Sequence, residues 1–135
     1  MHTRGFISIQ LSIFIFIAAA LVAASLIAFG QAQALAHNQE RISDIKQIQT
    51  ALKIYFTDNG FYPPGNGLGG PSGMNNYLNF WPTPPQGIGS CSKTQNIYSY
   101  AEKSSGTDYE LSFCLGTAVN GLSAGIHTVT AAGIQ

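Results

Sequence analysis

An uncharged, apolar run near the N-terminus constrains this chain more than any other feature of its sequence. No formally charged residue occurs between Arg4 and Glu40, and 14 of the 24 residues from Phe6 to Phe29 are Phe, Ile, Leu or Val. As a helix these residues would rise about 36 Å, which is longer than a hydrocarbon core about 30 Å thick. We therefore expect residues 6–30 to form a helix that enters a membrane.

Three interpretations of this run compete. A cleaved secretory signal would end at Ala-Gln-Ala (32–34) or Ala-Leu-Ala (34–36), although the run exceeds the roughly 7–15 apolar residues of such signals. A plain membrane anchor would keep Arg4 in the cytoplasm by the positive-inside tendency. A short leader ending at Gly5 would leave the apolar helix in the mature protein. The residues after the run favour the third.

The segment after the run continues the helical pattern. Residues 31–57 contain no proline and no glycine, and their apolar side chains recur at steps of three and four, as one helix face requires. This apolar stripe comprises Ile42, Ile45, Ile48, Leu52 and Tyr55/Phe56. The charged and amide residues expected largely off the stripe are Arg41, Asp44, Lys46, Gln47, Gln49 and Lys53. We expect an amphipathic helix over 31–57 that stops at Asp58-Asn59-Gly60.

The remaining chain predicts a small sheet behind a long loop. All 6 prolines lie in the loop-rich region 58–92. Within 93–135, alternating apolar and polar residues predict strands over 96–101, 108–115 and 125–130, joined as an antiparallel meander. Because such a sheet needs a cover for its apolar face, we expect the amphipathic helix to pack on it. The predicted class is therefore α+β.

The chain has 2 cysteines, Cys91 before the first predicted strand and Cys114 within the second. If both side chains point to the same side they can form a disulfide, which would stabilise the small head by about 3.5 kcal/mol in a loop-entropy model. Two free thiols are the alternative. A disulfide would place the head in an oxidising, exported location.

Composition argues against several classes of function. Only 9% of residues are charged, and 6 basic and 6 acidic residues cancel, so we expect no nucleic-acid partner. The 3 histidines (His2, His37 and His127) are far apart and have no ligand-like neighbours, and we expect His127 at the surface or an edge of the sheet. We expect no metal site, no cofactor, no catalytic residue and no enzymatic activity.

Several motifs together resemble type IV pilins and the pseudopilins of type II secretion. Arg4-Gly5-Phe6-Ile-Ser-Ile-Gln-Leu is similar to a prepilin leader junction, and the stretch from Asp44 through Asp-Asn-Gly60-Phe-Tyr-Pro63 is similar to the helix exit of short pilins. The tail resembles that of small disulfide-carrying pilins at Tyr109-Glu-Leu-Ser-Phe-Cys114-Leu and at Gly121-Leu-Ser-Ala-Gly-Ile-His127-Thr.

The resemblance implies a pilin-like fold with a leader (1–5), a membrane and filament-core helix (6–30) and a head (31–135). A prepilin peptidase would cut between Gly5 and Phe6 on the cytoplasmic face, and the new amino group of Phe6 would be methylated. The precursor would sit in the inner membrane with its N-terminus in the cytoplasm. The mature subunit would join an extracellular or periplasmic filament with copies of itself or other pilins.

One position departs from the family. Pilins usually carry a glutamate five residues into the mature chain, where this sequence has Gln10. An amide avoids the cost of burying a charge, but it would dock less strongly onto a neighbouring charged amino terminus. Three alternatives therefore stay open: a minor or initiating subunit, a filament that tolerates the amide, or a membrane-anchored assembly factor. An exported binding module released by signal cleavage is a further alternative.

Overall fold

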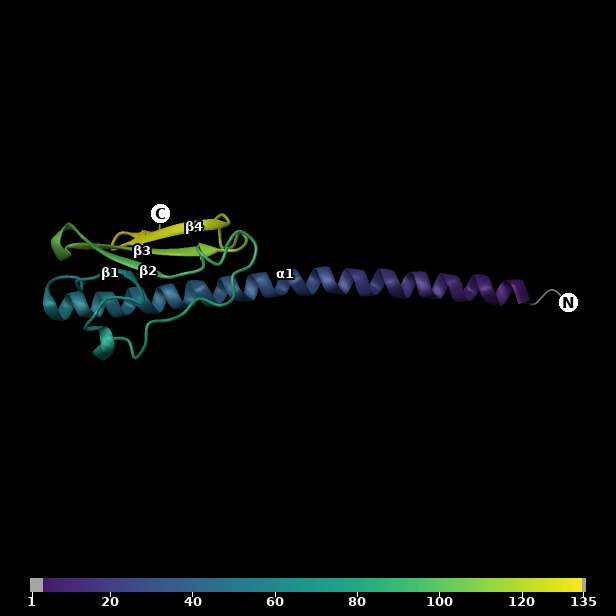
Figure 1. Cartoon of the computed structure of the whole chain (residues 1–135), viewed down its shortest axis with the longest axis horizontal. Helices are drawn as coiled ribbons and strands as arrows, with labels where there is room; N and C mark the ends of the chain where they lie inside the picture. Colours follow the sequence, from purple (N-terminus) through teal and green to yellow (C-terminus); the bar gives the residue numbers. More distant parts are fainter. Residues whose placement is uncertain (1–3, 135) are drawn as a thin grey trace. The chain divides into compact units, whose positions relative to one another are not determined.

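The structure is a computed structural model that describes the backbone of residues 4–134 and the side chains from Ile9 onward. Its chain divides into two compact units, Met1–Gln33 and Ala34–Gln135. Helix α1 (Arg4–Asn59) belongs to both units, and the second unit also contains an antiparallel sheet (Figure 1). The fold is α+β, as the sequence predicts.

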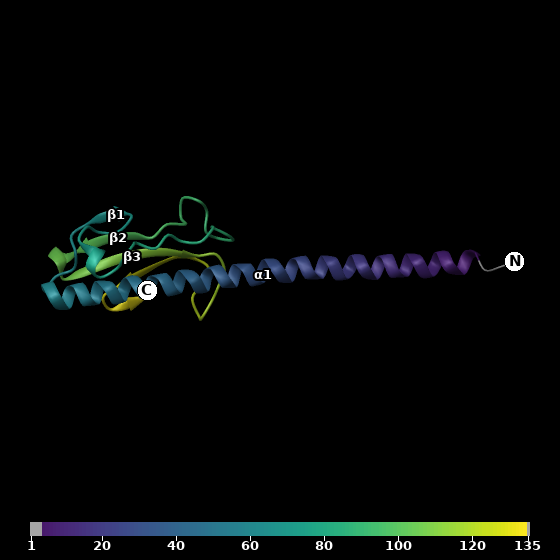
Figure 2. The ribbon, with the colours of Figure 1, turned by 90° about the horizontal axis from the view of Figure 1, so that it is seen from below.

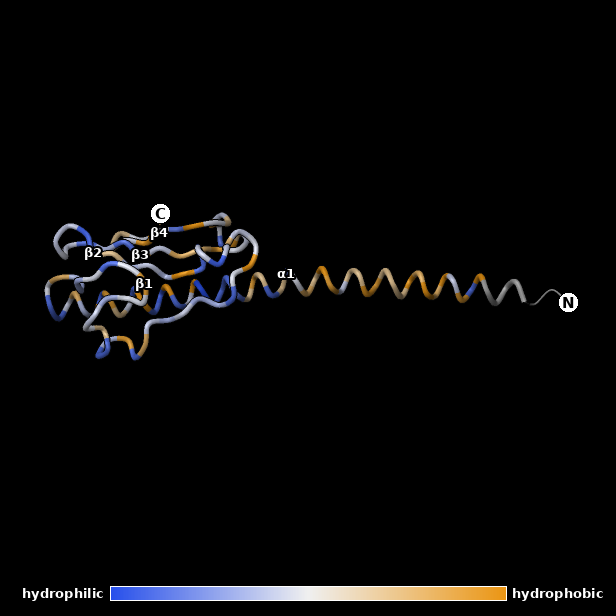
Figure 3. The backbone as a smooth tube through the Cα atoms, in the orientation of Figure 1, coloured by the Kyte–Doolittle hydropathy of each residue, from blue (hydrophilic) through white to orange (hydrophobic). Residues whose placement is uncertain are grey.

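The described part of the first unit is the N-terminal portion of α1. Every side chain described from Ile9 to Gln33 is exposed, and the large apolar ones between Ile9 and Phe29 are 50–78% exposed. The hydropathy-coloured backbone shows this apolar character along the segment (Figure 3). Within the described chain, α1 is the one helix long and apolar enough to cross a membrane.

The end of α1 follows from a glycine cap. The Gly60 N–H donates to the Phe56 carbonyl at 2.8 Å, and Gly60 has a φ of 80°. Glycine adopts this left-handed conformation without the steric cost that a side chain would bring. The helix therefore ends at Asn59, two residues later than the predicted end at Thr57.

The second unit contains a sheet of 5 antiparallel strands in the order β1-β2-β3-β4-β5. The strands are β1 (Asn66–Leu68), β2 (Ser99–Lys103), β3 (Asp108–Leu115), β4 (Gly125–Thr130) and β5 (Gly133–Ile134). Two short 3-10 turns, η1 (Met74–Asn76) and η2 (Ser104–Gly106), lie between them. Turning the view shows α1 running alongside the strands (Figure 2).

The prediction of three strands was wrong in number and in both boundaries of the first strand, which was predicted over 96–101 and spans 99–103. Strands β3 and β4 span the predicted residues, but β2 begins at Ser99 rather than at residue 96. Asn96 is instead held in a turn, where its N–H donates to the Ser92 carbonyl at 2.9 Å. The edge strands β1 and β5, three and two residues long, are too short to show alternation in the sequence.

The core lies between α1 and one face of the sheet. From the helix, Ile45, Ile48 and Leu52 are at most 1% exposed and Ile42 is 8% exposed, as the predicted apolar stripe requires. The sheet contributes the alternating side chains of β2, β3 and β4, which are Tyr100, Tyr109, Leu111, Phe113, Leu115 and Val129. This packing confirms that the amphipathic part of α1 covers the sheet.

Aromatic contacts fix much of the long loop against this core. Tyr77 packs edge-on against Tyr55 of α1 with ring centroids 5.1 Å apart, and Trp81 packs against Tyr100 at 6.2 Å. Gly70 lies beneath Trp81, where an added Cβ would come within 2.3 Å of the indole ring. The loop is therefore part of the folded head.

Candidate functional site

The first candidate surface is the apolar surface, defined as the exposed side chains from Ile9 to Phe29. Gln10 is exposed on it, beside Ile9 and Leu11. Gly5 and Phe6, the predicted cleavage and methylation positions, belong to the helical backbone of α1, but their side chains lie outside the described residues. The predicted leader, residues 1–5, also lies outside the described residues, apart from the backbone of residues 4 and 5.

The second candidate site is a polar cluster at the point where α1 first becomes buried in the head. Arg41 is fully buried, and its Nη2 donates to the carbonyls of Pro85 at 3.0 Å and Gln86 at 2.9 Å, and to Asn96 Oδ1 at 2.9 Å. Its Nε also points to Asn96 Oδ1, at 3.3 Å. Asn96 Nδ2 in turn donates to the Pro85 carbonyl at 2.7 Å. We call these four residues together with Asn38 the Arg41 cluster.

Asn38 joins this cluster to the chain after β3. It is fully buried, and its Nδ2 donates to the Thr117 carbonyl at 2.9 Å and to Thr117 Oγ1 at 2.8 Å. Its Oδ1 accepts the Gly116 N–H at 3.0 Å and an Arg41 N–H at 3.4 Å. Every polar atom of this buried amide thus has a partner, as burial in a core requires.

Burial dominates the electrostatics around the cluster. Burial lowers the pKa of the Arg41 guanidinium, while the nearby Tyr98, Glu40 and Asp44 act in the opposite direction. The pKa of Asp44 is raised by burial and by Glu40, against the lowering effects of Tyr98 and Arg41. Tyr98 donates its hydroxyl to Asp44 Oδ2 at 2.8 Å, and burial followed by this carboxylate raises the pKa of Tyr98.

Next to the cluster, Cys91 and Cys114 form the predicted disulfide, with Cα atoms 5.7 Å apart. The two backbones that it joins also approach closely. An added Cβ on Gly89 would lie 2.1 Å from the Gly116 carbonyl oxygen, and one on Gly116 would lie 2.4 Å from that of Ile88. Only glycines fit at these two positions, so the disulfide connects segments that are already tightly packed.

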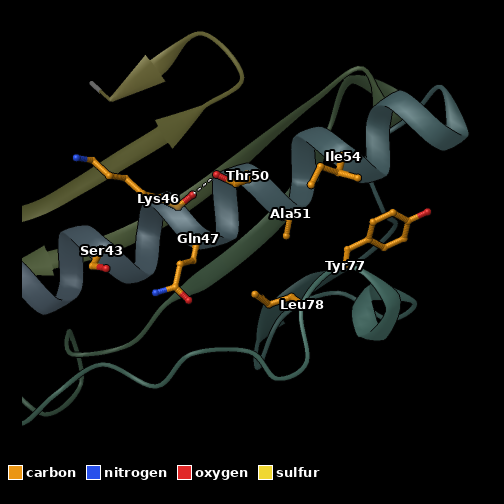
Figure 4. A pocket seen from close by; sticks show the side chains of 8 residues that line it. All are labelled: Ser43, Lys46, Gln47, Thr50, Ala51, Ile54, Tyr77 and Leu78. Carbon is orange, nitrogen blue, oxygen red and sulfur yellow. Dashed lines mark hydrogen bonds between the residues drawn. The ribbon is translucent and has the colours of Figure 1, made fainter.

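A third candidate is an open groove of about 380 Å³ beside the exposed face of α1 (Figure 4). Ala51 and Ile54 face Tyr77 and Leu78 of the loop across it. The complete lining is Ser43, Lys46, Gln47, Thr50, Ala51, Ile54, Tyr77 and Leu78. Lys46 is the only charged residue in this described lining, so the groove offers apolar contact rather than paired acid and base groups.

The histidines do not converge on a site. His127 is buried at 9% exposure, with Nε2 2.8 Å from the Ser123 carbonyl and its ring 5.6 Å from that of Phe113. The predicted surface position was wrong, because position 127 follows the inward alternation of β4. The predicted edge position is confirmed, because at His127 strand β4 pairs with β3 alone and meets β5 only at Val129 and Thr130. His37 Nδ1 lies 3.2 Å from the Gln86 carbonyl. Within residues 4–134, no three His, Cys, Asp or Glu side chains gather as a metal site would require.

Sequence reasoning missed the Arg41 cluster, because it placed Arg41 among residues largely off the buried stripe. The signal was present in the spacing. Asn38, Arg41, Ile42 and Ile45 follow the same three-and-four pattern as the apolar stripe, one turn toward the N-terminus. The buried face of α1 thus begins with two polar residues.

Comparison with known proteins identifies no relative of this chain. No protein-family model, curated protein or solved structure matches it. Function must therefore be inferred from the chain's own residues and from their geometry.

Proposed function

We propose that this chain is a structural subunit of a filament of the type IV pilus or pseudopilus kind, assembled through its apolar N-terminal helix. The observation that carries the proposal is the apolar surface on α1, whose large side chains from Ile9 to Phe29 are 50–78% exposed. The same helix continues into the head and covers its sheet. A helix that is apolar on all sides needs lipid or other apolar helices around it.

The physical basis of assembly is an exchange of neighbours. Lipid tails and the apolar side chains of identical helices offer similar surroundings, so the segment can leave a membrane for a bundle of copies of itself. The head remains outside this bundle because its own core is already covered by α1. Copies of this chain or other pilins are thus its principal partners, and its activity is structural rather than enzymatic.

The proposed maturation follows from the residues before the apolar run. A prepilin peptidase removes residues 1–5 at the cytoplasmic face of the inner membrane, and the amino group of Phe6 is methylated. The head lies on the exported side, where its disulfide is stable. The mature chain then enters an extracellular or periplasmic filament.

One residue favours a second candidate, an initiating subunit or a membrane-anchored assembly factor. Gln10 is an exposed amide within the apolar surface and carries no charge for pairing with a neighbour's amino terminus. An exported binding module is a third candidate. Signal cleavage after Ala34 or Ala36 would remove little of the second compact unit, which starts at Ala34.

Amino-terminal sequencing and intact mass of the native protein distinguish these candidates. A start at methylated Phe6 supports the filament subunit. A start at Leu35 or His37 overturns it in favour of an exported module, and a start at Met1 favours an unprocessed anchor. Gly5→Val is expected to retain the leader, because it places a bulky side chain at the cleavage position. Thr3→Val, two residues earlier, is the matched control and is expected to mature normally.

A further inference from the structure

We propose that the Cys91–Cys114 disulfide and Arg41 form a redox-dependent latch that closes one end of the head onto α1. The latch loop is defined as residues 85–96, which contain Cys91 and three of the residues that Arg41 contacts. The proposal concerns the head alone and holds whether or not the chain assembles into a filament.

The first step is the burial of a charge without an opposite charge bonded to it. Arg41 is 0% exposed, and the ion pair found among the described residues is elsewhere, between Lys103 and Glu110. The guanidinium depends on neutral oxygens, and those of Pro85, Gln86 and Asn96 all belong to the latch loop. A buried charge that loses its partners is strongly destabilising, so Arg41 stays buried only while the loop is in place.

The second step concerns what holds the latch loop. The loop contains no strand or helix, and several of its hydrogen bonds, such as those from Gln95 and Asn96 to the Ser92 carbonyl, are internal. Apart from its hydrogen bonds with Arg41 and His37, the loop makes one hydrogen bond to the rest of the described head, from the Ser90 N–H to the Gly116 carbonyl at 3.0 Å. It also packs closely against Gly116 through Ile88 and Gly89, and the disulfide joins it to β3. The disulfide is the covalent part of this attachment.

The third step concerns Cys114, the cysteine at the other end of the disulfide. Cys114 lies in β3 two residues before Gly116, and Asn38 binds both Gly116 and Thr117. The two chain segments that the disulfide joins therefore hydrogen-bond to Asn38 and to Arg41, which are three residues apart on α1. Asn38 and Arg41 are also the first buried residues along the described part of α1. The disulfide thus closes the polar end of the core.

Reduction reverses this closure. A dithiol reductant supplies two electrons and two protons, the Cys91–Cys114 bond becomes two thiols, and the reductant becomes its own cyclic disulfide. The latch loop then moves away from β3, and water replaces its oxygens around the Arg41 guanidinium. Residues 36–43 of α1 loosen, whereas the helix around Ile48 and Leu52 stays packed on the sheet. The head is therefore fully closed only in an oxidising compartment.

Hydrogen exchange of the full-length protein in detergent micelles tests the latch, with and without dithiothreitol. Reduction is expected to speed exchange over residues 36–43 and 85–96 by about tenfold or more, and to leave residues 48–54 and 108–113 unchanged. In Arg41→Met no charge needs the loop's oxygens, so reduction is expected to change exchange over 36–43 by less than about threefold. Lys53→Met removes an exposed charge from the same helix and is expected to respond like the wild type.

A second variant keeps the test decisive if Arg41→Met fails to fold. Asn96→Ala removes the one oxygen, Asn96 Oδ1, that accepts from both Nε and Nη2 of Arg41, while the disulfide stays intact. It is expected to speed exchange over 36–43 without any reductant. The proposal is overturned if this variant exchanges like the wild type. It is also overturned if reduction speeds exchange over the latch loop alone, or equally over 36–43 in Arg41→Met and the wild type.

Discussion

Asp44 makes the stability of the head depend on pH in an unusual direction for a carboxylate. Burial, with Glu40, raises its pKa against the effects of Tyr98 and Arg41, so the folded state binds a proton more tightly than the unfolded chain does. Its contribution to stability is therefore fully present below the ordinary Asp pKa of about 3.9 and is lost as the pH rises through the higher folded value.

Asp44→Asn removes this dependence, because the amide cannot ionise but its oxygen can still accept the Tyr98 hydroxyl. We expect the variant to gain stability relative to the wild type between pH 3 and pH 7. Urea unfolding of the full chain in detergent at both pH values measures the difference. Asp58→Asn removes an exposed carboxylate from the end of the same helix and serves as the comparison. A difference that does not change with pH, or that has the opposite sign, contradicts this account.

At the scale of single residues, the sequence predicted apolar burial well and polar burial poorly. Ile45, Ile48 and Leu52 are buried as their spacing indicates, because apolar side chains gain free energy from burial at any compatible position. Arg41 is buried only because oxygens 44, 45 and 55 residues later in the chain surround it. No local pattern specifies such distant partners.

At the scale of elements, the contact between α1 and the sheet holds the head together. Ile48 is 0% exposed within it, so Ile48→Ala leaves a cavity and is expected to cost about 2–5 kcal/mol of unfolding free energy. Ile54 lies on the same helix but is 48% exposed, and Ile54→Ala is expected to cost less than about 1 kcal/mol. Denaturant unfolding of both variants checks the prediction, and equal losses would contradict it.

The long elements were predicted from the sequence because each carries its own period. Helix α1 and strands β3 and β4 show their patterns over many residues. Strands β3 and β4 begin and end at the residues predicted from the sequence. Strands β1 and β5 exist through pairing with β2 and β4, which is set by the tertiary fold. The disulfide was predictable as a possibility, whereas its place beside the Arg41 cluster depends on the path of the latch loop.

At the scale of the whole molecule, the proposed assembly through the apolar surface can be tested at Gln10, the exposed amide within that surface. In a bundle of apolar helices, a carboxylate at this position could pair with the amino terminus of a neighbouring copy, which would offset the cost of burying both charges. We therefore expect Gln10→Glu to raise the number of subunits incorporated per filament, counted from labelled filaments. Gln33→Glu adds the same charge at an exposed position beyond the apolar surface and is expected to leave incorporation unchanged. If Gln10→Glu does not increase incorporation above this control, the amide is not what weakens docking.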